Sequence, residues 1–363
     1  MPPSEPAWWY GARGSGGMLA RALGPAGRLY GEIAMRRFRR ATPYRCRLPV
    51  ICVGNFTAGG TGKTPLSLAI GEYLIGIGEK PVFLTRGYRG RYKGPRWVDP
   101  KYDTVGDCGD EPLLLARTAP TLVSLDRKAG ALMIESGDER PASVIIMDDG
   151  LQNPALEKDL VIALVDGLRG VGNGEVIPAG PLRAPLEFQL GLVDCVVVNG
   201  GPNEPGTAAR PSGVLGWLKS QFMGPVLAGN VAPVGDAAWL RGAAIAAYAG
   251  IGNPARFFAT LEALGARLSK KIVFPDHHGF TEGDAGRLLA VARDTGAMLV
   301  TTEKDLARLA GLAGLNDKRA ELRSLSRALP VRFTFDDRDL ARLQALVDAA
   351  MKTGRQRENP DQP

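Results

Sequence analysis

From about residue 48 to residue 235, short runs of aliphatic and β-branched residues alternate with segments of helical periodicity. Runs that are apolar at nearly every position are typical of strands covered on both faces. One run begins at Val50, and the other candidate strands are 81–85, 121–124, 143–147, 160–165 and 194–198. The alternation predicts an α/β fold with a mostly parallel sheet and helices on both of its faces.

A second alternation, from 243 to 302, predicts a smaller C-terminal α/β unit with strands at 243–250, 271–274 and 298–302 and helices at 254–264 and 282–294. Glycines and prolines gather in 200–213, which predicts a loop leading into a hairpin linker. The sequence is therefore divided into an arm at 1–47, a core at 48–235, a smaller unit at 236–352 and a polar, disordered tail at 353–363.

The run that begins at Val50 leads into a glycine-rich stretch, residues 54–65. Gly59, Gly60 and Gly62 let the backbone approach an anion closely and take up positive φ angles, so that successive N–H groups face phosphate oxygens. The stretch ends on Lys63, which has the reach to contact the β- and γ-phosphates, and on a threonine hydroxyl suited to Mg²⁺. This arrangement is typical of the phosphate loop of nucleotide-binding proteins.

One position departs from the general pattern of such loops, because Thr57 stands where a glycine is usual. The β-branched strand before the loop and the amphipathic run 65–77 after it are the context that a phosphate loop requires. This context favours a P-loop fold over the alternative, a glycine-rich turn with an incidental lysine. The residues predicted to bind the nucleotide are Thr57, Ala58, Gly59, Gly60, Thr61, Gly62, Lys63 and Thr64.

Two carboxylates follow the apolar run 144–147 directly, and they are Asp148 and Asp149. An aspartate at the tip of a strand beside a phosphate loop is typical of a residue that holds Mg²⁺ opposite the loop hydroxyl, here that of Thr64. A polar turn after the strand is the alternative. The paired acids favour the metal site, and adjacent positions point in different directions, so only one of them need contact the metal.

A second acidic pair, Asp110 and Glu111, stands before Pro112 at the start of a predicted helix. Acids and proline favour the first turn of a helix, and the spacing alone favours this structural interpretation. A carboxylate close to a γ-phosphate is also able to accept the proton of an attacking hydroxyl.

Two glycine-punctuated loops carry arginines, at 85–91 and 172–185. Guanidinium groups in such loops are suited to holding a phosphate or another charged substrate, although solvated charged loops are also common. The candidate substrate contacts in them are Arg86, Tyr88, Asn173 and Arg183.

The composition of the chain disfavours a membrane-spanning or secreted protein. The chain has 363 residues, of which 45% are hydrophobic, and no apolar stretch in it is long enough to span a bilayer. The N-terminus lacks the pattern of a secretory signal, which predicts a protein that stays in the cytoplasm. Four cysteines lack metal-ligand spacing and are interpreted as reduced. The only two histidines are neighbours, His277 and His278, which marks their surroundings as a candidate site.

The net charge of +7 is concentrated in residues 1–47, which hold nine arginines and two glutamates, so the rest of the chain is neutral overall. Within this arm Leu29, Ile33 and Phe38 share one half of a helical wheel, and arginines share the other. The pattern predicts an amphipathic helix at a membrane surface. One alternative is a helix docked on the core. Another is an arginine-rich arm that binds RNA, which the absence of a recognisable RNA-binding module disfavours.

Taken together, the motifs resemble the tetraacyldisaccharide 4'-kinase family, which phosphorylates a lipid A precursor in Gram-negative bacteria. The resemblance covers residues 5–310. The segments that carry it are 54–65, 85–88, 109–112, 148–152, 172–174, 178–183, 274–278 and 301–305.

The resemblance implies that ATP, with Mg²⁺, phosphorylates the 4'-hydroxyl of a tetraacylated disaccharide 1-phosphate at the cytoplasmic face of the inner membrane. It also implies that Asp110 is the catalytic base, supported by His277, with Lys63 acting on the phosphates. Glu111 and Gln152 are implied as further substrate contacts. The glycolipid and the membrane surface are the expected partners; neither a nucleic acid nor an obligate protein partner is expected.

Two positions depart from the family pattern, since Asn153 replaces a histidine and Ala184 replaces a glutamate. Asparagine keeps hydrogen-bonding capacity but does not titrate near neutral pH. A rival interpretation is a membrane-associated ATPase switch, but such proteins have a lysine where Ala58 stands. A regulatory GTPase is weaker still, because no Asn-Lys-x-Asp motif occurs.

Overall fold

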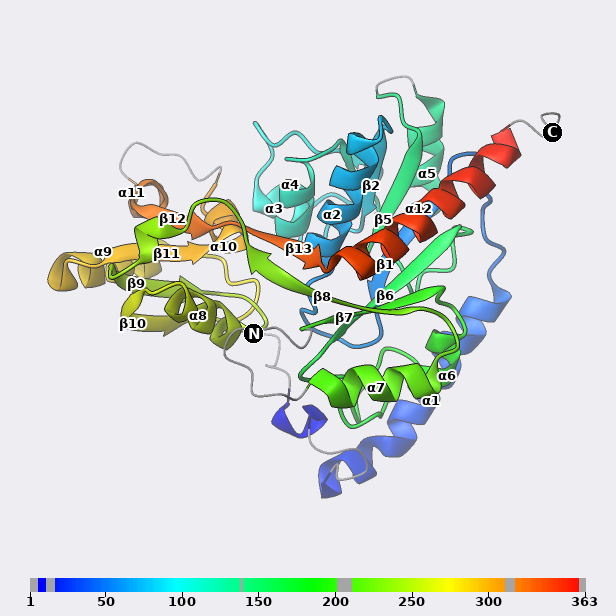
Figure 1. Ribbon diagram of the computed structural model, residues 1–363, viewed down its shortest axis with the longest axis horizontal. Helices are drawn as coiled ribbons and strands as arrows, with labels where there is room; N and C mark the ends of the chain where they lie inside the picture. Colours follow the sequence, from blue (N-terminus) through cyan, green and yellow to red (C-terminus); the bar gives the residue numbers. More distant parts are fainter. Residues whose placement is uncertain (1–5, 11–16, 138–139, 201–210, 311–316, 359–363) are drawn as a thin grey trace.

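The computed structural model describes residues 6–10, 17–137, 140–200, 211–310 and 317–358, and two sheets organise it (Figure 1). The larger sheet has nine strands in the order β13-β8-β7-β6-β1-β5-β2-β4-β3. Its strands are β1 (Val50–Asn55), β2 (Pro81–Thr85), β3 (Arg96–Trp97), β4 (Thr121–Val123), β5 (Val144–Asp148), β6 (Leu160–Asp166), β7 (Cys195–Asn199), β8 (Val226–Pro233) and β13 (Val331–Phe335). The pairs from β8 to β4 are parallel, and the two edge strands β13 and β3 are antiparallel.

Helices cover both faces of the larger sheet, as the sequence predicts. The elements of this unit outside the sheet are η1 (Ala7–Tyr10), α1 (Met18–Arg40), α2 (Lys63–Gly76), α3 (Val105–Cys108), α4 (Asp110–Leu115), α5 (Arg127–Ser136), α6 (Leu186–Leu190), α7 (Pro211–Gln221) and α12 (Asp337–Glu358). Side chains of β1 alternate between two cores: Ile51 and Val53 pack with residues of α2 and α12, whereas Val50 and Cys52 pack with residues of α5 and α7. This burial on both faces explains why the strand is apolar at every position.

The smaller unit lies beside the carboxyl ends of the larger sheet (Figure 1). Its sheet has four parallel strands in the order β10-β9-β11-β12. They are β9 (Ala244–Ala249), β10 (Arg267–Val273), β11 (Met298–Thr302) and β12 (Ser326–Leu329), and the helices are η2 (Ala238–Leu240), α8 (Pro254–Ala263), α9 (Glu282–Thr295), α10 (Glu303–Arg308) and α11 (Lys318–Leu325).

The chain returns to the larger sheet at its C-terminal end, which corrects the boundary drawn from the sequence. The range 236–352 was assigned to the smaller unit, but β13 pairs with β8, and Leu343 and Val347 of α12 are buried against the larger sheet. Helix α12 continues to Glu358, so the tail predicted at 353–363 is helical in its first part. Residues 359–363 lie outside the described residues.

Most predicted elements are confirmed to within a few residues, and the misses have local causes. The helix predicted from about Pro112 begins at Asp110, because Gly109, with φ of 94°, already turns the chain into it. The predicted loop 200–213 overlaps helix α7 from Pro211 onward, and its residues 201–210 lie outside the described residues. The two strands that link the units, β8 and β13, are far apart in sequence and escaped prediction.

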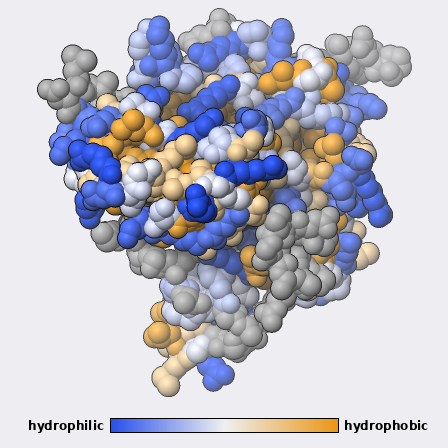
Figure 2. Space-filling model, turned by 60° about the vertical axis from the view of Figure 1, so that its left-hand side comes forward, coloured by the Kyte–Doolittle hydropathy of each residue, from blue (hydrophilic) through white to orange (hydrophobic). Residues whose placement is uncertain are grey.

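Helix α1 docks on the core through its small residues and leaves large apolar side chains exposed. A Cβ at Gly27 would lie 2.7 Å from the Val176 carbonyl oxygen, and one at Gly31 would lie 3.1 Å from the Pro185 ring. Leu29 and Ile33 stay 64% and 57% exposed. Apolar residues gather at the projecting lower end of the molecule, where Figure 1 places α1 (Figure 2). Within the described residues, no helix has both the length and the apolar character needed to cross a bilayer.

Candidate active site

The loop that joins β1 to α2 is held by side chains of the neighbouring strands. Asn55, the last residue of β1, donates from Nδ2 to the Thr57 carbonyl at 2.7 Å, and its Oδ1 accepts from Lys63 Nζ at 3.2 Å. Gly62 has φ of 94°, and a Cβ there would lie 2.7 Å from Asn199 Nδ2, so the position requires glycine. Lys63 therefore opens α2 with its ammonium directed back toward the loop.

The groups of this loop differ in their availability to a ligand. The Ala58 N–H donates to the Pro181 carbonyl at 2.8 Å, so this predicted contact is already engaged within the protein. Gly59, Gly60 and Thr61 line a hollow together with Tyr10, Asp166, Arg169 and Gly170. Across the described residues, Thr61 Oγ1 is one of the few buried side-chain polar atoms that lack a hydrogen-bond partner. A buried hydroxyl without a partner beside a hollow is the arrangement that a polar ligand satisfies.

Asp148 and Asp149, at the end of β5, have different surroundings. Asp148 accepts from the Ser67 hydroxyl at 2.7 Å, and burial raises the pKa of its carboxyl. Asp149, with φ of 55°, lies 3.0 Å from Arg183 Nη1 and 3.5 Å from Lys63 Nζ. Burial alone would raise the pKa of the Asp149 carboxyl, but the two cations hold it below its ordinary value. The carboxylate of Asp149 thus has two cations close to it, whereas that of Asp148, within the part of the chain that the structure describes, has the Ser67 hydroxyl as its hydrogen-bond partner.

The different surroundings of Asp148 and Asp149 indicate which of these acids is suited to bind Mg²⁺. A hard cation takes carboxylate and hydroxyl oxygens. Asp148 offers a carboxylate and Thr64, on the helix whose Ser67 contacts Asp148, offers a hydroxyl, and both residues are almost fully buried. The raised pKa of Asp148 reflects a buried charge that a bound cation would stabilise. The donor set fits a magnesium ion, with Asp148 better suited as a direct ligand than Asp149.

Arg183 and Gln152, predicted substrate contacts, brace the phosphate loop. Arg183 donates from Nε to the Thr57 carbonyl at 3.1 Å. Gln152 donates from Nε2 to the Asn55 carbonyl and to Gln189 Oε1, each at 2.8 Å. Both side chains therefore fix the shape of the loop, and the Arg183 guanidinium keeps Asp149 charged. Asn153, at the position that departs from the family pattern, accepts from the Ala155 N–H at 2.9 Å within its own turn.

The remaining candidates in the arginine-bearing loops are divided by burial. Asn173 is buried and donates to the Ala179 carbonyl at 3.0 Å, so it holds its own loop together. Arg86 is exposed, and Tyr88 is 51% exposed with its ring 5.4 Å from the His277 ring, measured between centroids. The loop after β2 thus places Tyr88 beside His277, whereas Asn173 lies inside the fold.

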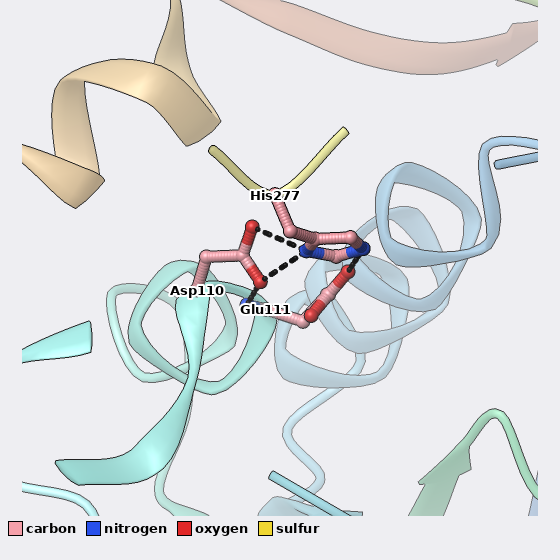
Figure 3. A group of neighbouring side chains, drawn as sticks. All are labelled: Asp110, Glu111 and His277. Atoms are coloured by element: carbon pink, nitrogen blue, oxygen red, sulfur yellow. Dashed lines mark hydrogen bonds and ion pairs between the residues drawn. The ribbon is translucent and has the colours of Figure 1, made fainter. Parts of the chain in front are cut away.

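A second group of polar side chains joins the two units. His277, in the loop after β10, directs Nδ1 to both carboxylate oxygens of Asp110, at 3.2 Å and 3.1 Å (Figure 3). His277 has φ of 57°, and Arg89 donates to its carbonyl at 2.8 Å. The predicted pairing of Asp110 with His277 is therefore present in the geometry, although the residues stand 167 positions apart.

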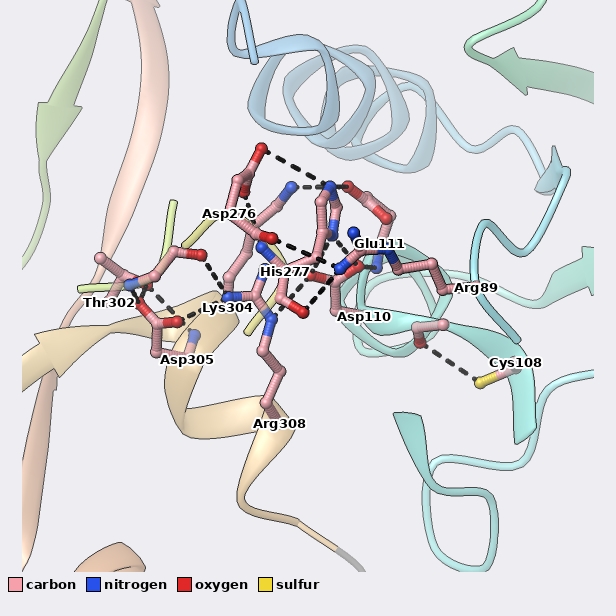
Figure 4. A network of polar contacts seen from close by, with 12 residues as sticks. Arg89, Cys108, Asp110, Glu111, Asp276, His277, Thr302, Lys304, Asp305 and Arg308 are labelled. Atoms are coloured by element: carbon pink, nitrogen blue, oxygen red, sulfur yellow. Dashed lines mark hydrogen bonds and ion pairs between the residues drawn. The ribbon is translucent and has the colours of Figure 1, made fainter. Parts of the chain in front are cut away.

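Helix α10 supplies two cations to the same group, and neither of them was predicted from the sequence to have a role. Lys304 Nζ lies 2.7 Å from Glu111 Oε1, and Arg308 donates from Nε to Asp110 Oδ2 at 2.9 Å (Figure 4). The two cations are four positions apart at the end of a predicted strand, so they share one face of a helix. This four-residue spacing is the feature of the sequence that could have marked Lys304 and Arg308 as a pair, but it does not show which acids they contact.

The charges in this group set its protonation states. Burial would raise the pKa of the Asp110 carboxyl, but the hydrogen bond from His277 and the charges of Lys304 and Arg308 hold it well below its ordinary value. Burial and the adjacent Asp110 raise the pKa of the Glu111 carboxyl. Oxygen and nitrogen atoms of Asp110, Glu111 and His277 lie within 4.8 Å of one another. Because Lys304 and Arg308 already neutralise both acids, this set does not fit a metal site.

The two groups act on each other electrostatically. Burial lowers the pKa of the Lys63 ammonium, and the Glu111 charge is among those that oppose this effect. Lys304 is likewise among the charges that oppose the raised pKa of Asp148. A Cβ at Gly252, in the loop after β9, would lie 3.5 Å from the Gly60 Cα, so the smaller unit also reaches the phosphate loop directly. Where the two units meet, the fold therefore brings together a phosphate loop, a metal-type acid and an ionised carboxylate held by a histidine.

Comparison with known proteins is consistent with this chemistry. The model of the Tetraacyldisaccharide-1-P 4'-kinase family matches residues 19–352. A protein named tetraacyldisaccharide 4'-kinase from Parvibaculum lavamentivorans is 45% identical over 97% of this chain and 99% of its own length. One of the same name from Nitrobacter winogradskyi is 44% identical over the same shares. The crystal structure of LpxK from Aquifex aeolicus in complex with ATP has a TM-score of 0.70 and 24% identity, covering 92% of this chain and all of that one.

Proposed function

Because the chain belongs to the Tetraacyldisaccharide-1-P 4'-kinase family, we propose that it transfers the γ-phosphate of ATP to the 4'-hydroxyl of a tetraacyldisaccharide 1-phosphate. The enzyme is a lipid A pathway phosphotransferase with an alcohol acceptor, and its product is lipid IVA. The observation that carries the assignment of residues is the Asp110 carboxylate, kept ionised by His277 in the cleft that also holds Lys63.

The phosphate loop binds and orients the donor. The amides of Gly59 and Gly60 and the unpartnered Thr61 hydroxyl face the phosphates, and the Lys63 ammonium moves from Asp149 to the β- and γ-phosphate oxygens. Burial lowers the pKa of Lys63, so negative phosphates are the partners that its charged form needs.

Asp110 acts on the acceptor. The 4'-oxygen forms a bond to the γ-phosphorus while the bond between that phosphorus and the β,γ-bridging oxygen breaks, and ADP leaves. Asp110 takes the hydroxyl proton, and His277 Nδ1 keeps the carboxylate oriented. General base catalysis of this kind contributes about 10²- to 10⁴-fold to rate. The exposed Arg86 and Tyr88 contact the charged sugar at the cleft entrance.

Thr64 and Asp148 are the residues that would hold Mg²⁺. The ion, when bound, neutralises charge on the transferring phosphoryl group. Asp149 stays with Arg183 and supports the loop rather than binding the metal directly.

Helix α1 holds the enzyme at the cytoplasmic face of the inner membrane. Its exposed apolar side chains enter the acyl boundary, and its arginines meet anionic headgroups at about 1 kcal/mol each. The supporting observation is that the helix buries Ala20, Gly27 and Gly31 against the core and keeps Leu29 and Ile33 in solvent. An acylated acceptor then reaches the cleft without leaving the bilayer fully.

The test is transfer of labelled γ-phosphate from ATP to purified disaccharide 1-phosphate lipid in detergent micelles. The native chain and Asp236→Asn, a change of an exposed acid in the smaller unit, should both transfer label. Asp110→Asn should lose about 10²- to 10⁴-fold in kcat. ATP hydrolysis by folded protein that does not depend on the lipid would instead support a membrane-associated ATPase switch.

A further inference from the structure

Arg308, the last residue of α10, is a buried cation with every guanidinium nitrogen engaged. Its side chain is 2% exposed. Nε donates to Asp110 Oδ2 at 2.9 Å, and Nη2 donates to the same oxygen. Nη1 donates to Asp305 Oδ1 at 2.6 Å and to the Gly250 carbonyl at 2.5 Å. The guanidinium is therefore fixed from one side by the smaller unit and presents its other edge to the carboxylate (Figure 4).

The two side chains that hold the Asp110 carboxylate belong to one frame in the smaller unit. The Gly250 carbonyl, at the end of β9, accepts from the His277 N–H at 3.1 Å as well as from Arg308. The Gly250 N–H donates to Asp305 Oδ2 at 3.0 Å. His277 and Arg308 are thus fixed relative to each other, and the orientation of Asp110, which comes from the larger unit, depends on both.

The two carboxylate oxygens are not equivalent. Oδ2 has three donor atoms within hydrogen-bond distance, which are Nε and Nη2 of Arg308 and Nδ1 of His277. Oδ1 has two, which are the Glu111 N–H at 3.1 Å and the same His277 Nδ1 at 3.2 Å. Oδ1 is therefore the less occupied oxygen and the better placed to receive the proton of an acceptor hydroxyl.

We infer that Arg308 is a positioning residue for phosphoryl transfer, which saturates Oδ2 of Asp110 and thereby turns Oδ1 toward the acceptor hydroxyl. This inference rests on the proposed role of Asp110 as the base. It adds a requirement that the pairing with His277 does not impose, because His277 faces both oxygens about equally, at 3.2 Å and 3.1 Å. The base is then correctly oriented only when the two units are docked.

Several charged groups face Asp110 and set the conditions of a test. From α10 come Arg308 and Lys304, and from the loop after β10 come His277 and Asp276, whose Oδ2 lies 3.7 Å from His277 Nε2. Glu111 adjoins Asp110 on α4 itself. Removing the Arg308 charge while the others stay should raise the pKa of the base, since an adjacent opposite charge lowers a carboxyl pKa by roughly 1 to 3 units.

A simpler explanation is that Arg308 only joins the two units, and Arg332, a more exposed arginine that also joins them, supplies a control. Arg332 of β13 donates from Nε to Glu72 of α2 at 2.9 Å, and its Nη1 lies 3.6 Å from Glu303 of α10. It therefore also links the larger unit to α10. It has no contact with Asp110 among the interactions of the described residues.

The experiment measures kcat and KM for ATP and for the lipid acceptor against pH in micelles, with circular dichroism at each pH, for the native chain, R308Q, R308K and R332Q. For R308Q we expect kcat to fall about 10²-fold with little change in KM for ATP. The acidic limb of its kcat profile should move up by roughly 1 to 3 pH units. R308K keeps the charge, so its acidic limb should stay near that of the native chain while kcat is only partly restored. R332Q should have the same kcat and the same acidic limb as the native chain.

Each other outcome overturns the inference. If folded R308Q has the kcat of the native chain and the same acidic limb in its kcat profile, Oδ1 is oriented without Arg308. Equal losses in R308Q and R332Q, with the limb unmoved, would show that both arginines only join the units. If R308Q fails to fold, R308K decides, because native kcat in that variant would exclude a need for the two-nitrogen contact. Full activity of Asp110→Asn would instead refute the proposed base, a result that is read independently of Arg308.

Discussion

The Lys63 ammonium lies 3.5 Å from Oδ1 of Asp149, and the same oxygen accepts from Arg183 at 3.0 Å, so two cations of the phosphate site share one acid. Asp149 adopts a left-handed backbone conformation, with φ of 55°, that directs its carboxylate to this position. The acid therefore holds the lysine beside the loop and competes with phosphates for it. The lysine can leave this pair for phosphate oxygens, while Arg183, which also donates to the Thr57 carbonyl, remains to neutralise Asp149.

Replacing Lys63 with alanine should abolish activity without unfolding the protein. We expect kcat to fall at least ~10²- to 10³-fold, the effect of removing one preorganised charge from a developing transition state. The protein should stay folded, because Arg183 remains beside Asp149 as a counter-charge when the ammonium is removed. Lipid phosphorylation and urea unfolding check this, with Lys270→Ala, an exposed lysine, as the control. Substantial remaining activity would remove the phosphate-loop assignment.

Asp110 should contribute to stability in a pH-dependent way. Its folded-state pKa is depressed, so its contribution is fully present above the unfolded pKa of about 3.9 and is lost as pH falls toward the folded value. Asp110→Asn also leaves Arg308 with one fewer counter-charge. At pH 7 the variant should be less stable by about 3 to 5 kcal/mol, and the difference should narrow below pH ~4. Urea unfolding of the native chain and of Asp110→Asn at pH 7 and pH 3.5 measures the difference in their free energies of unfolding. If that difference does not change with pH, the depressed pKa of Asp110 is contradicted.

The C-terminal helix should be required for the larger sheet. Leu343 of α12 is 5% exposed among the side chains of β1 and α2, whereas Leu340, one turn earlier, is 38% exposed. Leu343→Ala should cost about 2 to 5 kcal/mol, the range for a buried leucine, and Leu340→Ala should cost clearly less. Chemical denaturation of the pair measures the difference. Equal, small losses would mean that α12 does not contribute to this core.

The sequence was sufficient to predict the central part of the fold because its signals are local. The phosphate loop, the strand before it and the acids at the end of β5 lie within short segments whose apolar and glycine patterns specify their geometry. The parallel sheet then implies that these segments meet at one edge. The structure adds which acid is free for a metal, because Arg183 and Lys63 reach Asp149 only once the chain is folded.

The long-range pairings could not be predicted in the same way. Arg308 contacts Asp110 across 198 positions, and the residue pairs between β13 and β8 span from 98 positions (Val331 with Pro233) to 106 (Phe335 with Gly229). An amphipathic pattern shows that a helix such as α12 has a buried face but not which sheet covers it. For this reason the sequence did not predict that residues 331–358 return to the larger unit. It also did not predict the role of α10, because basic residues on a helix are usually exposed to solvent and the sequence does not show that these two contact Glu111 and Asp110.

The exposed face of α1 should bind membranes, and Ile33→Glu tests this against Leu325→Glu on α11. The two side chains are 57% and 56% exposed, so the changes are matched in exposure and charge, but Ile33 lies on the long helix α1, beside the exposed Leu29, whereas Leu325 ends the short helix α11. Losing a buried isoleucine costs about 1.5 to 3 kcal/mol, so binding of Ile33→Glu to vesicles containing anionic lipid should fall roughly 10- to 100-fold. Flotation or sedimentation with such vesicles measures binding, and kcat in micelles should stay native because the cleft is untouched. Leu325→Glu should bind as the native chain does. Equal binding by both variants would show that α1 is not the membrane-binding surface, and equal loss would show that the effect is one of net charge alone.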